Sequence, residues 1–172
     1  MNETTKSLAL VTLAFTLAQM SIAAERPLAL KPSEDACFER TYSADHLKKH
    51  PKQSVRWIRV EHARSSGEFN HTEIKTKFIG DHRLFSGFGT CQRDEKAGRL
   101  VCAIDCDGGT YTLSERDDGK IVLRPTDRIR VVACGGDEDD DRPYRQIMAA
   151  DDQDAFVLER MPKSRCMLKP ID

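Results

Sequence analysis

The chain has 172 residues, of which 39% are hydrophobic and 32% charged, and its net charge is −1. This length favours a single domain, since domains typically contain about 100–150 residues. A mean hydropathy of −0.55 excludes a polytopic membrane protein, and the ordinary hydrophobic content argues against a wholly disordered chain. Because the net charge is near zero and no basic stripe is visible, we expect no nucleic acid partner.

The first 24 residues have the three parts of a secretory signal peptide. Lys6 precedes an apolar stretch from Leu8 to Ala18, and small residues follow as far as Ala24. The stretch is about half the roughly 20 residues that a membrane-spanning helix needs. We therefore predict cleavage after Ala23 or Ala24 and a periplasmic or secreted location. Residues 25–172 then form one mature domain, which contains no membrane span and is expected to be monomeric.

In chain order, the first feature of the mature part is a short helix. Ser43 is a suitable N-cap, Asp45 falls in the first turn, basic residues fall in the last turn, and Pro51 stops the helix. His46 and His50 are four residues apart and share a face of this helix. They lack a third ligand and the glutamate of a His-Glu-x-x-His motif, so we predict a solvated helix face and no metal site.

Between Val55 and Met161 the sequence repeats one arrangement, in which a run rich in Val, Ile, Phe, Thr and Leu is followed by a turn signal. Asp-Gly between such runs favours a hairpin, and regular spacing of this kind is typical of antiparallel sandwiches and barrels. We predict an all-β domain of about eight antiparallel strands. The predicted runs are Val55–Ala63, Thr72–Ile79, Arg83–Cys91, Arg99–Asp105, Thr110–Glu115, Ile121–Arg124, Arg128–Cys134 and Ala155–Arg160.

Two details of this pattern bear on side-chain direction. Period-2 alternation from Leu100 places Cys102, Ile104 and Cys106 on one core-like face. Gly87 and Gly89 interrupt a strand, which indicates a bend or the close approach of another element. Ser86 beside them lacks the strand-to-helix turn of a hydrolase nucleophile.

The six cysteines indicate disulfides, because an even number follows a signal peptide. Cys91 and Cys102 flank a turn-like segment, and directly opposed hairpin residues have the Cα separation that a disulfide spans. Cys37 and Cys166 lie near the two mature ends, which a bridge would tie down. The remaining pair is Cys106 with Cys134. The spacing of Cys102 and Cys106 also fits zinc, but no second close pair completes such a site.

Crowded carboxylates suggest calcium, and their spacing argues against it. The run Asp137–Asp141 is followed by Asp151, Asp152 and Asp154, but it lacks the glycine and the ligand spacing of an EF-hand. In the loop from Asp105, the residue at the twelfth position is Arg116 instead of glutamate. We predict no metal and no cofactor, and no catalytic set stands out among the carboxylates.

A resemblance covers most of the mature chain. His50-Pro51-Lys52-Gln53, Gly89-Thr90-Cys91, Leu100–Gly109 and Asp151-Asp152 occur in the same order in small exported bacterial proteins without an assigned function, which this chain resembles. The Cys-Asp-Gly-Gly block at Cys106–Gly109 is the most specific element. The resemblance implies export and no particular activity.

Two classes of function remain open from the sequence. The first is an exported, disulfide-stabilised, non-enzymatic module that binds a protein or a small ligand, such as an inhibitor or a partner protein of the cell envelope. The second is a small exported hydrolase whose active site is assembled from several loops, since catalytic residues need not be neighbours in sequence. A pocket with convergent polar groups would be the feature to examine.

Overall fold

Several strands bury every second side chain, as their sequence pattern predicts. In β6 (Arg99–Ile104), for example, Leu100, Cys102 and Ile104 are buried and the intervening residues are exposed. The computed structural model describes residues 25–26, 28, 35–63, 70–134, 143–149 and 154–166. The expected signal peptide at 1–24 and the acidic run at 137–141 lie outside these residues.

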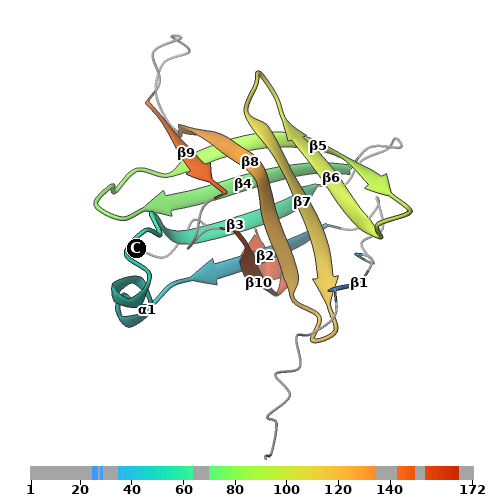
Figure 1. Ribbon diagram of the computed structural model, residues 1–172, viewed down its shortest axis with the longest axis horizontal. Helices are drawn as coiled ribbons and strands as arrows, with labels where there is room; N and C mark the ends of the chain where they lie inside the picture. The colour runs from blue at the N-terminus through green and yellow to red at the C-terminus, as the bar shows by residue number, and fades with distance from the viewer. Residues whose placement is uncertain are drawn as a thin grey trace, which may run out of the picture.

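The described elements are ten strands and two short helices (Figure 1). In chain order they are β1 (Glu25–Arg26), β2 (Ala36–Thr41), α1 (Ala44–Lys49), β3 (Val55–Ala63), β4 (Asn70–Phe78), β5 (Phe85–Asp94), β6 (Arg99–Ile104), β7 (Gly109–Arg116), β8 (Ile121–Ala133), β9 (Tyr144–Met148), β10 (Phe156–Arg160) and α2 (Lys163–Cys166).

Eight of the strands form a closed antiparallel barrel. The pairing runs from β2 through β3, β4, β5, β6 and β7 to β8, and β10 closes the ring because it pairs with both β8 and β2. The seam between β10 and β2 is short, with only Glu159↔Glu39 and Arg160↔Phe38 in register. Two further strands lie outside the ring: β1 pairs with β7, and β9 pairs with β8. The predicted all-β antiparallel domain is therefore confirmed, and of the two architectures left open, sandwich and barrel, the structure has the barrel.

β8 corrects one predicted turn. The two expected runs around Pro125-Thr126-Asp127 form one continuous strand in the structure. Arg116 N–H donates to Lys120 O, and the alternation of an antiparallel ladder then directs the nitrogen of Pro125 away from β7. On that side β8 changes its partner, from β10 at residues 121–123 to β9 at residues 128–132. Proline is tolerated there because the position needs no ladder N–H.

The helix prediction is confirmed, and three strands were missed. Ser43 caps α1, and its hydroxyl accepts a hydrogen bond from His46 N–H at 3.2 Å. The predicted runs include none of β1, β2 and β9, and β1 is only two residues long. In β2 three consecutive residues from Ala36 to Phe38 are buried, and in β9 only Ile147 is buried, so neither strand shows alternation.

The barrel interior is filled by side chains from all the ring strands. Tyr111 is fully buried, and its hydroxyl hydrogen-bonds the Thr72 hydroxyl. Gly89 makes room for this pair, because a Cβ there would lie 3.0 Å from the Tyr111 hydroxyl oxygen. A Cβ on Gly87 would lie 3.1 Å from Arg130 O. The prediction that these glycines permit close approach is thus confirmed, and the dense interior accounts for most of the stabilisation, at roughly 1.5–3 kcal/mol per large apolar side chain.

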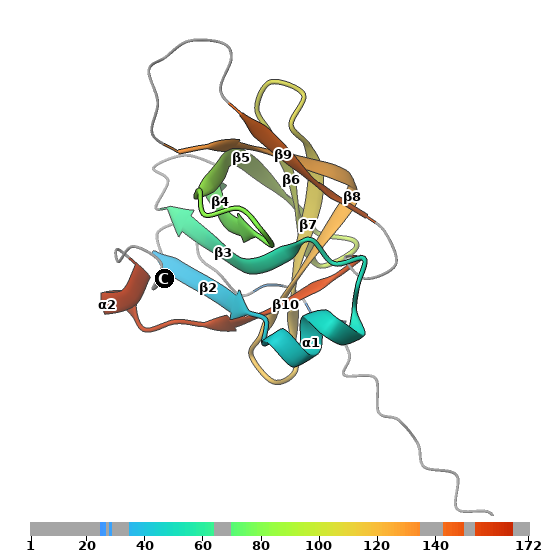
Figure 2. The same cartoon turned by 90° about the vertical axis from the view of Figure 1, so that its left-hand side faces the viewer.

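Two of the three expected disulfides are present. Cys91 and Cys102 are direct partners across the β5–β6 hairpin, with a Cα–Cα distance of 3.9 Å. Cys37 on β2 and Cys166 on α2 are 5.5 Å apart at Cα and join the ends of the domain. Figure 2 shows α2 beside the start of β2.

The expected Cys106–Cys134 bridge is absent, and both thiols are free and exposed. β6 ends at Ile104, so Cys106 lies in the following turn with a φ of 54° and does not continue the core-facing row. Gly108 O, in the same turn, accepts from Arg130 N–H. Cys134 lies four residues beyond Arg130, or about 13 Å along an extended strand, which is farther than a disulfide spans.

Asp81, in the turn between β4 and β5, connects that turn to β9. Its carboxylate accepts hydrogen bonds from Arg83 Nε at 2.9 Å and Arg83 Nη2 at 2.7 Å, and from Arg145 Nη2 at 3.1 Å. The hydrogen bonds from Arg83 are the main reason that the pKa of Asp81 is far below its usual value of 3.8, and Arg145 adds to the effect.

We expect Asp81 to remain ionised in acid that protonates an ordinary aspartate. Because its folded-state pKa is lowered, its contribution to stability is fully present above pH 3.8 and is lost only as the pH falls through the lowered pKa. Side-chain carboxyl ¹³C shifts recorded against pH will test this. Arg83→Gln should move the titration of Asp81 toward 3.8, and Arg128→Gln should not. An Asp81 that titrates near 3.8 in the parent would contradict the assignment.

Candidate functional site

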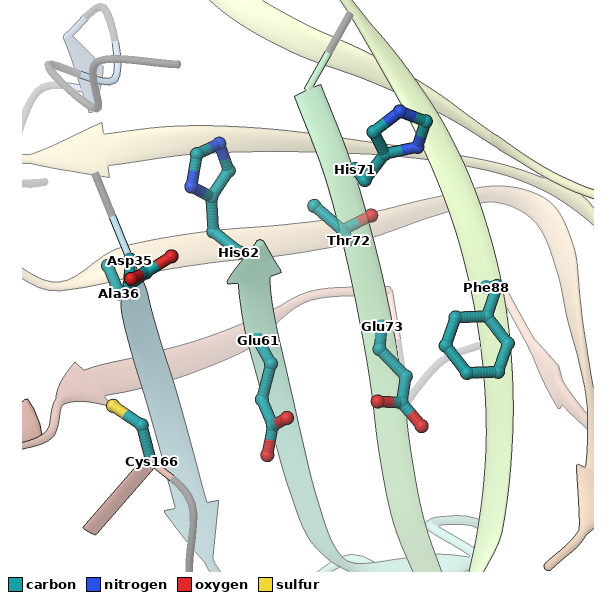
Figure 3. A pocket seen from close by; sticks show the side chains of 9 residues that line it. All are labelled: Asp35, Ala36, Glu61, His62, His71, Thr72, Glu73, Phe88 and Cys166. Atoms are coloured by element: carbon teal, nitrogen blue, oxygen red, sulfur yellow. The ribbon is translucent and has the colours of Figure 1, made fainter. Parts of the chain in front are cut away.

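A hollow of about 220 Å³ lies on the outer wall of the barrel, where β2, β3, β4 and β5 run side by side (Figure 3). We call it the outer groove. Its lining combines acidic, histidine and apolar side chains, namely Asp35, Ala36, Glu61, His62, His71, Thr72, Glu73, Phe88 and Cys166.

The register of four strands places the central residues of the groove in one row. Cys37 is opposite Glu61, Glu61 is opposite Glu73, and Glu73 is opposite Phe88. Directly opposed residues of antiparallel strands project on the same face of the sheet. The row therefore begins at the disulfide to Cys166 and ends at an aromatic ring, with two carboxylates between them.

Lys75 holds together the two opposed carboxylates, which would otherwise repel each other, and Arg59 contacts one of them. Lys75 Nζ lies 2.7 Å from Glu61 Oε2 and 3.0 Å from Glu73 Oε2. The Arg59 side chain is only 3% exposed, and its Nη1 lies 3.4 Å from Glu61 Oε1. Arg59 also donates through Nε and Nη2 to Glu39, at 2.9 and 2.6 Å. In these contacts three carboxylates share two cations, so the five side chains together carry one net negative charge.

Lys75 remains a cation in this setting. Burial alone would lower its pKa, but the hydrogen bonds to Glu61 and Glu73, together with the charges of those two residues, outweigh the burial and raise the pKa of Lys75. Lys75 contacts only Oε2 of Glu73, and among the described residues Oε1 has no partner. A free carboxylate oxygen therefore remains at the centre of the groove.

The walls of the groove are apolar on two sides. Phe88 is 61% exposed, which is unusual for a large aromatic side chain in a sheet whose other aromatics are mostly buried. The Cys37–Cys166 bridge forms the opposite wall. Asp35 adds a further carboxylate at one end, and the exposed His71 lies at the other. This combination suits a ligand with an apolar stem and a positive end.

The sequence analysis did not identify the residues of the groove. Glu61, Glu73 and Lys75 occur in strands as ordinary polar alternation, and only the β3–β4 register shows that the two glutamates are opposite. The exposed Phe88 was visible only as part of a glycine-rich strand. One signal of the site was nevertheless present in the sequence. Glu73 and Lys75 alternate with Ile74 and Thr76, which places the two charged side chains on the same face of the strand.

The side chains singled out in the sequence lie elsewhere. The His46 and His50 rings stack with centroids 4.2 Å apart on α1, and His46 Nε2 is 3.1 Å from Gln53 Oε1. Ser86 is nearly buried on β5, and its Oγ is 3.3 Å from the Cys134 thiol. Cys106 occupies an exposed turn. Of the residues expected to contribute disulfides, only Cys166 lines the groove.

Within the described ranges, no group of three or more His, Cys, Asp or Glu side chains is arranged to hold a metal ion. The helices of the described part are all too short or too polar to cross a membrane. Comparison of the chain with protein-family models, with curated proteins and with solved structures finds no match.

Proposed function

We propose that this protein is an exported, monomeric, non-enzymatic binding module, and that the outer groove holds a lysine or arginine side chain of a partner protein. The observation that carries the proposal is the unshared Glu73 oxygen between the Phe88 ring and the Cys37–Cys166 bridge. The methylene stem of a basic side chain would lie against these two apolar walls. Its cationic end would meet the net negative charge, and Phe88 offers a face for cation–π contact.

The size of the groove supports a side chain as its occupant. Sites for cofactors and drug-sized ligands usually enclose about 300–1,000 Å³, and this groove encloses about 220 Å³. It lies on the strands of a barrel cross-linked by two disulfides, which keeps the groove preformed. Disulfides persist in oxidising compartments, so they also fit the predicted export.

The alternative, a small exported hydrolase, has one observation in its favour. The opposed carboxylates of Glu61 and Glu73 resemble the paired acids that glycoside hydrolases use. Lys75 Nζ contacts both of them, however, and lies where a reacting bond or a water molecule would have to be placed. Turnover of a chromogenic glycoside that disappears in Glu73→Gln would favour this alternative.

A pair of nearly isosteric probes tests the proposal. N-acetyl-arginine amide carries the cation, and N-acetyl-citrulline amide replaces it with a neutral urea. In ¹⁵N-resolved NMR titrations we expect the arginine probe to shift the amide signals of Glu61, Thr72, Glu73 and Phe88 in a saturable manner at millimolar concentration. The citrulline probe should leave these signals in place, because it has no charge to pair with Glu73.

Variants test which side chains of the outer groove bind the arginine probe. Glu73→Gln should weaken arginine binding about fivefold, since a partly exposed ion pair contributes up to about 1 kcal/mol. Phe88→Ala should weaken it by a similar factor through the lost cation–π contact. Asp118→Asn, in the turn between β7 and β8, is the matched control and should bind as the parent does. Equal shifts with both probes, or no shifts at all, would contradict the proposal.

A further inference from the structure

A second surface lies at the end of the sheet, on β9. This strand pairs with β8 in the register Arg128↔Met148 to Val132↔Tyr144, and the strand order ends there. In the described part of the chain, its other edge pairs with no strand (Figure 1). An open edge is a template for a further strand unless something covers it or makes pairing unfavourable.

The ladder shows which backbone groups are free on that edge. Ala133 N–H donates to Pro143 O, and Ala149 N–H donates to Asp127 O. Because hydrogen-bonded pairs alternate along antiparallel strands, Arg145 and Ile147 also direct their backbone groups toward β8. The N–H and C=O groups of Tyr144, Gln146 and Met148 therefore point outward. Each of these three side chains is exposed, and within the described ranges no other strand lies along this edge.

The side chains beside this edge give it a chemical preference. Arg128 and Arg130 are exposed on the neighbouring β8, and in the described ranges neither has a carboxylate partner. The Arg130 guanidinium lies over the Tyr144 ring, 4.3 Å from its centroid, which directs the cation toward the β9 edge. Tyr144 and Met148 are 51% and 42% exposed. The edge thus combines apolar contact area with two exposed arginine side chains.

We infer that the free edge of β9 binds an extended acidic segment of a partner protein by strand addition. Backbone hydrogen bonds to Tyr144, Gln146 and Met148 would hold the segment, and its outward carboxylates would pair with Arg128 and Arg130. An added strand lies about 10 Å from β8, two strand spacings away. A glutamate and an arginine extended toward each other cover that distance. Because this surface shares no residue with the outer groove, the inference stands or falls independently of the proposed function.

Amide hydrogen exchange measured by NMR tests the inference, with a seven-residue peptide in which glutamate alternates with valine as the probe. In the free protein the N–H groups of Arg145 and Ile147 should be protected, and those of Tyr144, Gln146 and Met148 should exchange freely. At a peptide concentration of about ten times Kd, exchange at these three amides should slow roughly tenfold. A peptide with lysine in place of glutamate should leave them unprotected.

Two variants separate backbone pairing from charge. Gln146→Pro removes an outward N–H that β8 does not use, so it should reduce peptide binding while Ile147 N–H stays protected. Arg128→Glu with Arg130→Glu should reduce binding of the glutamate peptide and improve that of the lysine peptide. If Gln146→Pro unfolds β9, the charge-reversal pair still decides the question.

Three results would overturn the inference. The first is unchanged exchange at Tyr144, Gln146 and Met148 with saturating glutamate peptide. The second is equal protection by heparin, which has charge but no peptide backbone and would indicate a general anion surface. The third is protection of these amides without peptide together with a dimer in sedimentation, which would assign the edge to a second copy of the chain.

Discussion

Replacing Cys37 and Cys166 together by alanine is expected to lower the free energy of unfolding by about 4–5 kcal/mol. The bridge closes a loop with a sequence separation of 129 residues, and a bridge that closes a long loop restricts the unfolded chain most. It also lies beside the short β10–β2 seam, where only two residue pairs are in register. Urea denaturation of the oxidised proteins measures the difference.

The free cysteines provide the matched control for this experiment. Cys106→Ala with Cys134→Ala makes the same number of substitutions at thiols that are exposed and unbridged, so its free energy of unfolding should equal that of the parent within about 0.5 kcal/mol. A Cys37→Ala, Cys166→Ala protein that unfolds at the parental urea midpoint would show that the ends of the domain are held without the bridge.

Gly109→Ala is expected to cost about 2–5 kcal/mol and to prevent β7 from forming its first pair with β8. Gly109 has a φ of 86°, and a Cβ there would lie 1.8 Å from Arg128 O, which is a backbone atom. The left-handed conformation alone costs an alanine roughly 1–2 kcal/mol. Displacing the backbone of β8 adds a further overpacking cost of about 1–3 kcal/mol.

Gly119→Ala isolates the conformational part of this cost. Gly119 has a φ of 77°, and a Cβ there would meet nothing within 4 Å. We expect Gly119→Ala to cost about 1–2 kcal/mol in thermal or urea denaturation, with no structural shift in β8. Equal costs for the two variants would mean that β8 accommodates the added methyl group without strain.

The all-β fold was predictable because alternation and turn signals are carried by residues close together in sequence. The closure of the strands into a barrel, and the strands that make up its ring, were not. The predicted number of eight counted β8 twice and omitted β2. Pro125 looks like a turn residue until one knows that β8 changes partners beside it. In β2, Cys37 is buried on the outer face by its bridge to α2. Alternation is lost wherever both faces of a strand are covered.

The outer groove was not predictable, for a different reason. Glu61 and Glu73 become neighbours through pairing between two strands, and a shift of one residue in that register would move one of them to the other face. The β3–β4 pairing itself contains an irregularity between Val55 and Trp57. Single-sequence patterns give the period of a strand but do not give its partner's register. A site built across strands is therefore found only when the register is known.

The closure of the ring between β2 and β10 has a consequence for biosynthesis. Cys37 belongs to the first strand of the ring, and its partner Cys166 follows the last. If the chain is exported as proposed, Cys91 and Cys102 emerge long before Cys166, and an oxidant that joins cysteines in order of appearance would first pair Cys37 with the wrong partner. We therefore expect maturation of the exported chain to require delayed oxidation of Cys37 or a disulfide isomerase.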